Sequence, residues 1–147
     1  MGLDMYLYGK KYFSSFNEEK KAQADRIGEI LNIPADLEVK EISVEFGYWR
    51  KANHIHNWFV NNIQKGTDNC GTYYVSPEQL QELHKACKEV LENKNSAKNI
   101  LPTASGFFFG NTSYDDCYFG DCEHTIKIID RCLQHKGDFY FSYHSSW

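Results

Sequence analysis

The sequence predicts an α+β fold: a single domain over residues 1–147, with a mixed or mainly antiparallel sheet of about five short strands and about four helices. Three observations support this class. A chain of 147 residues can bury roughly two thirds of its unfolded surface in one core without disulfides or metal. Segments with an apolar period of two alternate along the chain with segments of helical period. The strand-like segments also carry polar residues at every second position, which parallel strands buried on both faces would not.

Two segments in the first third of the chain have the period of a half-buried strand. The first is 1–8, whose apolar face consists of Leu3, Met5 and Leu7. The second is 38–46, whose apolar face consists of Ile42, Val44 and Phe46. The side chains between them are polar or tyrosine, so one face of the predicted sheet should meet solvent.

Capping signals place two helices. Ser15 and Glu18 fit a capping box for a helix that stops near Pro34. Ser76 and Gln79 form a clearer capping box, because Ser76 is followed by Pro77. Proline suits the first helical position, where no backbone N–H is needed. That helix should bury an aliphatic stripe formed by Leu80, Leu83, Cys87, Val90 and Leu91.

The second half adds three strands and one helix. Residues 72–75 and 139–147 have strand patterns, and the segment Gly106–Gly110, with its three phenylalanines, predicts a buried strand. Ser113 and Asp116 can cap a helix that runs to about Gln134. The strand at the end should turn an aromatic face inward.

The remaining helix is predicted over 49–63 and is the unusual one. Its apolar stripe is formed by Ala52, Ile55, Phe59 and Ile63. The opposite face carries neutral amides, although asparagine is a poor helix former and a solvated face normally collects glutamate and lysine. Arginine can grip a phosphate with two hydrogen bonds, and aromatic rings can stack on a base. We therefore expect a ligand site formed by Tyr48, Trp49, Arg50, Asn53, His54, Asn57, Trp58 and Asn61. The alternative without a ligand, which we call the bland alternative, is that loop backbone forms hydrogen bonds with the polar face of this helix.

No motif predicts a reaction, a metal site or a cofactor. His54 and His56 project about 200° apart on a helix and cannot share an ion. The five cysteines lack the short paired spacing of structural zinc sites, and reduced thiols are expected. Cys70 with a histidine base, or an acid such as Asp115, could form a catalytic site, but nothing in the sequence fixes that geometry.

Charge and hydropathy limit the partners. A net charge of −4 and a pI near 5.8 argue against duplex nucleic acid, which needs a basic face. No apolar stretch predicts a signal peptide or a membrane span, so a cytoplasmic protein is expected. Whether the chain forms a homo-oligomer stays open.

Six separated segments stand out along the chain: MGLDMYLY, GYWRKANHIHNWFV, DNCGTYYVS, LPTASGFFFG, SYDDCYF and HSSW. Together they resemble a family of small uncharacterised bacteriophage and prophage proteins. The resemblance implies an accessory protein made in the host cytosol, and it carries no activity to any residue. Proteins in that setting are often inhibitors or sponges aimed at host defence.

Three functions are therefore compatible with the sequence. The first is a binding protein that sequesters a nucleotide-like molecule or blocks a host protein. The second is a small hydrolase acting on nucleotides or nucleic acid, with His54, Asp115 or Cys70 in its site. The third is an acidic protein inhibitor, because residues 99–147 carry six acidic and three basic side chains.

Overall fold

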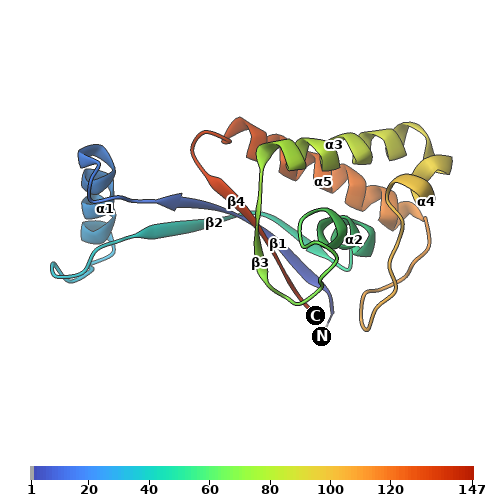
Figure 1. Ribbon diagram of the computed structural model, residues 1–147, viewed down its shortest axis with the longest axis horizontal. Helices are drawn as coiled ribbons and strands as arrows, with labels where there is room; N and C mark the ends of the chain where they lie inside the picture. Colours follow the sequence, from blue (N-terminus) through green and yellow to red (C-terminus); the bar gives the residue numbers. More distant parts are fainter. Residues whose placement is uncertain (1) are drawn as a thin grey trace.

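The computed structural model describes residues 2–147 and contains one antiparallel sheet with helices packed mainly on one face (Figure 1). The strands are β1 (Asp4–Tyr12), β2 (Glu41–Arg50), β3 (Thr72–Val75) and β4 (Tyr140–Ser146). Their order across the sheet is β2-β1-β4-β3, and every neighbouring pair is antiparallel. The α+β class and the mainly antiparallel sheet are thus confirmed, with four strands among the described residues.

The longer helices are α1 (Glu18–Ile30), α2 (Asn53–Asn62), α3 (Pro77–Glu92) and α5 (Asp116–Gln134). A short turn of 3₁₀ helix (Lys94–Ser96) and α4 (Ala97–Ile100) follow α3, and the sequence pattern did not predict them. None of these helices is both long enough and apolar enough to cross a membrane, within residues 2–147.

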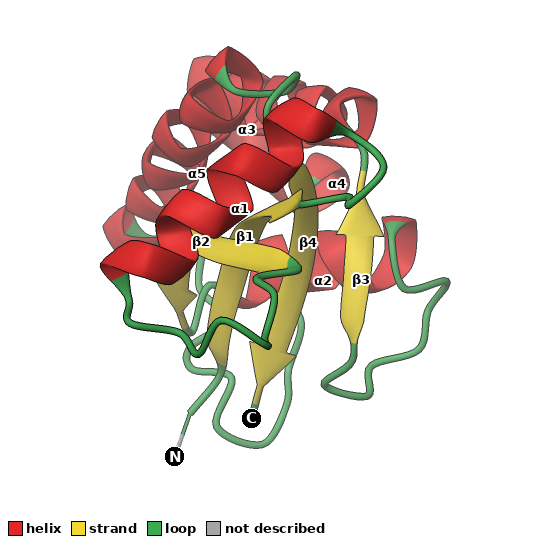
Figure 2. Cartoon of the chain, turned by 90° about the vertical axis from the view of Figure 1, so that its left-hand side faces the viewer, coloured by secondary structure: helices red, strands yellow, loops and turns green. Residues whose placement is uncertain are grey.

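The core lies between the sheet and three of the helices. α3 and α5 pack against each other, and α5 also packs on β2, while α2 lies beside them on the same face (Figure 1). The predicted inward residues are Leu3, directly before β1, and Met5 and Leu7 within it, and they are fully buried with Phe141 and Tyr143 of β4. The opposite face carries none of these three helices (Figure 2). The tyrosines of β1 alternate outward on this open sheet surface.

The ribbon of β1 and β2 extends away from this core and ends in α1 (Figure 1). The predicted Ser15–Glu18 capping box is wrong, since Asn17 caps α1 by accepting a hydrogen bond from the backbone of Lys20. By contrast, α3 begins with the reciprocal box of Ser76 and Gln79 that the sequence predicts.

A bulge in β2 explains the largest error in the predicted elements. The register shifts between Leu7, opposite Gly47, and Tyr8, opposite Glu45, so Phe46 is the additional residue. After the bulge the inward positions become Gly47 and Trp49, and β2 continues to Arg50. The predicted helix 49–63 therefore begins later, at Asn53, and Trp49 lies in a strand.

Gly47 is required where α5 crosses β2. A Cβ atom at this position would overlap the side chain of Ile128, so only glycine allows the helix to approach the strand this closely. The same packing continues toward the end of β2, where the indole N–H of Trp49 donates to Thr125 Oγ1 of α5.

Two further predictions are wrong. The segment Gly106–Gly110 is a loop, not a strand, because Phe108 and Gly110 both have positive φ and only Phe109 reaches the core. The predicted cap of Ser113 and Asp116 is replaced by Asp115, whose carboxylate accepts a hydrogen bond from the backbone of Tyr118. The predicted end of this helix, near Gln134, is confirmed.

Candidate functional site

A surface depression of about 390 Å³ lies where β2 ends and where α2 and α5 begin. Its wall includes Arg50, Lys51, Asn53 and His54 from the β2–α2 corner, and Asp115, Tyr118 and Asp121 from the N-cap and first turns of α5. The long α4–α5 loop closes the remaining side with Thr103, Gly110, Asn111 and Ser113. The volume is within the range of small-ligand sites. We call it the α2 depression.

The long loop is held by an amide of α2. The Asn53 side chain donates to the carbonyls of Phe109 (3.1 Å) and Asn111 (2.8 Å), and its oxygen accepts from the backbone N–H of Ala104 (3.1 Å). Asn57 also donates to the carbonyl of Pro102 at 3.1 Å. Loop backbone therefore satisfies much of the amide-rich face, as the bland alternative expected.

His54 forms part of the floor and is nearly inaccessible. Its ring lies against that of Tyr118, with 3.9 Å between centroids, and Nε2 lies 3.7 Å from Sγ of Cys122. Burial lowers the pKa of His54 to about 3, so the imidazole is neutral at physiological pH. A neutral ring can donate from one nitrogen and accept at the other, and Nδ1 makes no hydrogen bond with the residues that the structure describes.

The ionisable groups of the depression differ in exposure and in pKa. Arg50 and Lys51 are exposed cations at its edge. Hydrogen bonds from the Tyr118 backbone and from Asn111 lower the pKa of Asp115, whose carboxylate is occupied in capping α5. Burial raises the pKa of Asp121 to about 6, although His124 opposes the shift. The depression thus combines two free cations, a neutral imidazole and a carboxyl group that titrates near neutrality.

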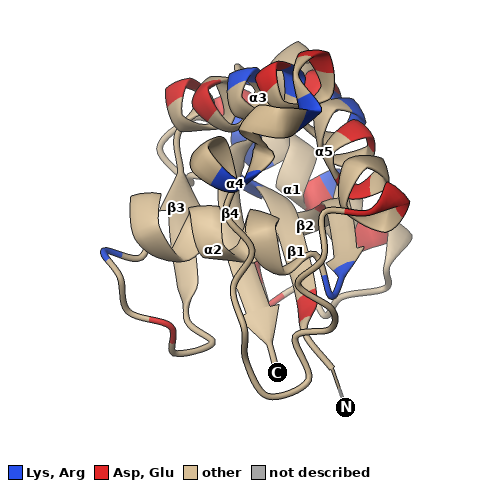
Figure 3. Ribbon diagram, turned by 90° about the vertical axis from the view of Figure 1, so that its right-hand side faces the viewer, with Lys and Arg blue, Asp and Glu red and all other residues tan. Residues whose placement is uncertain are grey.

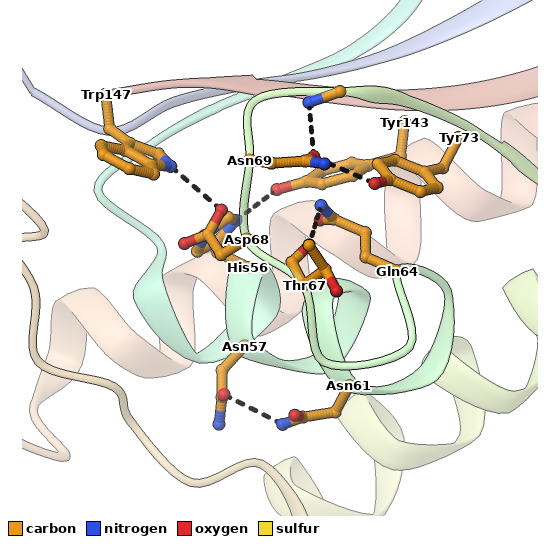
Figure 4. A network of polar contacts seen from close by, with 11 residues as sticks. His56, Asn57, Asn61, Gln64, Thr67, Asp68, Asn69, Tyr73, Tyr143 and Trp147 are labelled. Carbon is orange, nitrogen blue, oxygen red and sulfur yellow. Dashed lines mark hydrogen bonds and ion pairs between the residues drawn. The ribbon is translucent and has the colours of Figure 1, made fainter.

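The depression collects only some of the residues predicted for a ligand site. It contains Arg50, Asn53 and His54. Asn57 and Asn61 lie further along α2 and bond to each other, as Figure 4 shows. Trp58 is half-buried against the core.

The two other predicted residues precede α2 on opposite faces of the sheet. Trp49 is only 2% exposed, and its indole N–H donates to Thr125 Oγ1 at 2.8 Å. Tyr48 points to the open face, where its hydroxyl donates to Asp4. Neither ring reaches the α2 depression.

The pattern missed Lys51 and Asp121. Lys51 follows the strand directly and adopts a positive φ of 60°, which places it at the corner of the chain before α2. Asp121 comes from a helix distant in sequence, and only the packing of α5 on β2 brings it to Arg50. The adjacent cations Arg50 and Lys51 were the one sequence feature that could have indicated the role of Lys51.

A separate polar network lies on the other side of α2 (Figure 4). His56 Nε2 lies 2.9 Å from Asp68 Oδ2, and Nδ1 lies 2.7 Å from the hydroxyl of Tyr143. Trp147 Nε1 donates to the second oxygen of Asp68 at 3.0 Å. His56 and Tyr143 are both buried, and both ring nitrogens of His56 already have partners within the protein. We therefore interpret this network as structural.

The catalytic alternatives gain little from this geometry. No hydrogen bond joins Cys70 to His54 or His56 among the described residues. Cys87 is buried beside Cys122, and their hydrogen bond together with burial raises the pKa of the Cys87 thiol. It therefore stays protonated and is a poor nucleophile.

The titration of Asp121 provides a test of the depression. A folded-state pKa above the unfolded value means that the folded protein binds this proton more tightly, so the stability it adds below pH 4 is lost as pH rises through 6. Asp121→Asn removes the loss. We expect the free energy of unfolding of the variant, relative to that of wild type, to be about 1 kcal/mol higher at pH 8 than at pH 4. The effect is this small because the Asp121 side chain is only half-buried. Urea unfolding of both proteins at pH 4 and at pH 8 measures this change. If variant and wild type differ by the same amount at both pH values, the raised pKa of Asp121 is contradicted.

Comparison with known proteins adds no family assignment. No family model matches the chain, and neither a curated protein nor a solved structure is similar to it at a significant level. Function must therefore be inferred from the residues and their geometry.

Proposed function

We propose that this protein binds a nucleotide-like anionic ligand in the α2 depression and does not convert it. The observation that carries the proposal is the pair of exposed cations, Arg50 and Lys51, at the edge of a depression whose wall holds His54 and Asp121. The guanidinium of Arg50 suits a phosphate, and Lys51 adds a second countercharge.

The wall supplies hydrogen-bonding groups suited to the edge of a base. Nδ1 of neutral His54 can donate or accept one hydrogen bond, depending on the tautomer, and ionised Asp121 accepts from amino and ring N–H groups. A ligand that donates a hydrogen bond to Asp121 would stabilise the charged form, and its binding would release a proton near pH 6.

The setting we propose is that of a phage or prophage accessory protein, in which such binding removes a nucleotide signal from the host. The support for this setting is the sequence resemblance described above. Blocking a host protein through the same surface is the related alternative, and it requires no small ligand.

Isothermal titration with a panel of linear and cyclic nucleotides tests the proposal. We expect at least one nucleotide to bind, and Arg50→Ala to weaken that binding about tenfold or more, because a charge-assisted pair to phosphate is lost. Arg26→Ala is the matched control, since Arg26 is an exposed arginine of α1 outside the depression. A panel without heat or binding, or equal affinities for both variants, would count against the proposal.

One observation keeps the hydrolase as a second candidate. A carboxyl group with a pKa near 6 in a depression is suited to general base catalysis. Mass spectrometry of the incubated panel separates the two functions. New products that disappear with Asp121→Asn would establish hydrolysis, and an unchanged mixture supports binding alone.

A further inference from the structure

The open face of the sheet carries six of the ten tyrosines of the chain. They alternate outward from all four strands and are Tyr6, Tyr8, Tyr12, Tyr48, Tyr74 and Tyr140. We call this surface the tyrosine face. Several of its rings contact one another, such as Tyr6 with Tyr8 at 5.7 Å and Tyr12 with Tyr140 at 5.8 Å between centroids.

Strand propensity explains part of this pattern, because tyrosine suits a sheet and cross-strand ring pairs stabilise it. It does not explain how much of the rings stays in solvent at one end. Tyr74 and Tyr140 are 59% and 58% exposed, and Tyr12 is 45% exposed. These three rings line a groove of about 340 Å³. Residues of α1, the helix that stands beside the sheet in Figure 2, line it as well.

Three lysines converge on the same groove from separate parts of the chain. Lys11 comes from β1, Lys20 from α1, and Lys136 from the turn between α5 and β4. None of them makes an ion pair within residues 2–147. The groove also contains two acids, Glu19 and Asp138, so the three lysines leave it with a net positive charge.

We propose that the tyrosine face and this groove bind single-stranded nucleic acid. Exposed rings on an open antiparallel sheet stack on unpaired bases, and lysines beside them neutralise the phosphates. The groove has the size of a small-ligand site and can hold only part of an oligonucleotide. The rest of the nucleic acid would extend from the groove across Tyr8 towards Tyr6 and Tyr48. Duplex does not fit, because its bases are stacked internally and the whole protein is acidic.

The inference goes beyond the proposed function, since the groove and the α2 depression share no residue. They lie at opposite ends of the molecule, with α1 at one end and the start of α5 at the other (Figure 1). A separate ligand class and a separate set of variants can therefore test each.

The test is fluorescence anisotropy with labelled single-stranded RNA and DNA of about 12 nucleotides. We expect binding that strengthens from mononucleotide to oligonucleotide and fails for duplex. At most three phosphates are neutralised, so log K should fall against log salt with a slope no steeper than about −2. An unlabelled mononucleotide that displaces the labelled strand as effectively as an unlabelled oligonucleotide would overturn the proposal, whereas a nucleotide bound in the α2 depression should not displace it.

Variants separate stacking from charge. Tyr74→Ala with Tyr140→Ala should weaken oligonucleotide binding about 25-fold or more, given about fivefold or more for each lost stacking ring. Phe107→Ala is the matched control, because Phe107 is an aromatic residue 80% exposed on the α4–α5 loop. Lys136→Glu should weaken binding several-fold and flatten the salt dependence, whereas Lys88→Glu on α3 should change neither.

All five substituted side chains are exposed, so circular dichroism should show folded proteins. Asp121→Asn should leave oligonucleotide binding unchanged and so keeps this proposal independent of the α2 depression. If the tyrosine and lysine variants bind as wild type does, the tyrosine face is only a structural surface and the proposal is wrong.

Discussion

Replacing His56 by alanine is expected to lower the free energy of unfolding by about 3 to 4 kcal/mol. The imidazole is buried, and its loss leaves a cavity together with the unpaired hydroxyl of Tyr143. Asp68 loses the second partner of its carboxylate as well. Urea unfolding followed by circular dichroism measures the change, and the slope with denaturant should stay constant.

The direction of the hydrogen bonds makes this result sharper. The carboxylate of Asp68 can only accept, so Nε2 of His56 donates to it, and in this tautomer of the neutral ring Nδ1 accepts from Tyr143. Burial raises the pKa of Tyr143 well above its usual value, which keeps its hydroxyl protonated as the donor. Tyr143→Phe should therefore cost about 1 to 2 kcal/mol in wild type and much less in the His56→Ala background.

His84→Ala is the matched control for His56→Ala. His84 also has an aspartate partner, since Nε2 lies 2.9 Å from Asp130 Oδ1, but that aspartate is exposed on the outside of α5. We expect a cost below about 1 kcal/mol. Equal losses for the two histidines would show that the buried network is not what fixes α2.

The network explains why the depression on the other side of the helix is preformed. His56 ties α2 to β4 and to the loop containing Asp68, whereas Asn53 ties it to the α4–α5 loop. Fixed on both sides, α2 holds His54 in one place relative to Arg50 and α5. Little ordering of this helix is left for a ligand to induce, which favours binding.

Local signals predicted the parts of the fold that depend on neighbouring residues. The Ser76–Gln79 box is closed within one turn of chain, and the alternation of β1 needs only its own sequence. The bulge at Phe46 could not be predicted in this way, because it is defined by the pairing with β1. One extra residue changed which side chains of β2 face inward and turned a predicted helical start into strand.

The predicted site divides for the same reason. A helical wheel correctly placed Asn53 and His54 away from the apolar stripe of α2, but it could not show that the 102–111 backbone covers that side. The contribution of Asp121 depends on the packing of α5, which no local pattern contains. The outward tyrosines of β1, in contrast, follow from alternation alone, and only their solvent exposure required the structure.

Trp49 and Trp58 were both expected to contact a ligand, and the structure gives them different roles. Trp49→Ala should lower the free energy of unfolding by about 3 to 5 kcal/mol, since a fully buried indole is lost beside Phe59. Thr125 also loses its donor partner. Trp58 lies at the edge of the same core, so Trp58→Ala should cost about 1 to 2 kcal/mol.

A cycle isolates the hydrogen bond from the packing. Trp49→Phe keeps an aromatic ring and should cost about 1 to 2 kcal/mol, part of which should vanish when Thr125→Val is already present. Thermal and urea unfolding measure these differences. At temperatures where Trp49→Phe is folded, any nucleotide bound by wild type should bind with unchanged affinity, because the ring does not line the α2 depression. A loss of affinity in the folded variant, without a matching loss in Trp58→Ala, would instead place the ligand on the buried side of β2 and contradict the site described above.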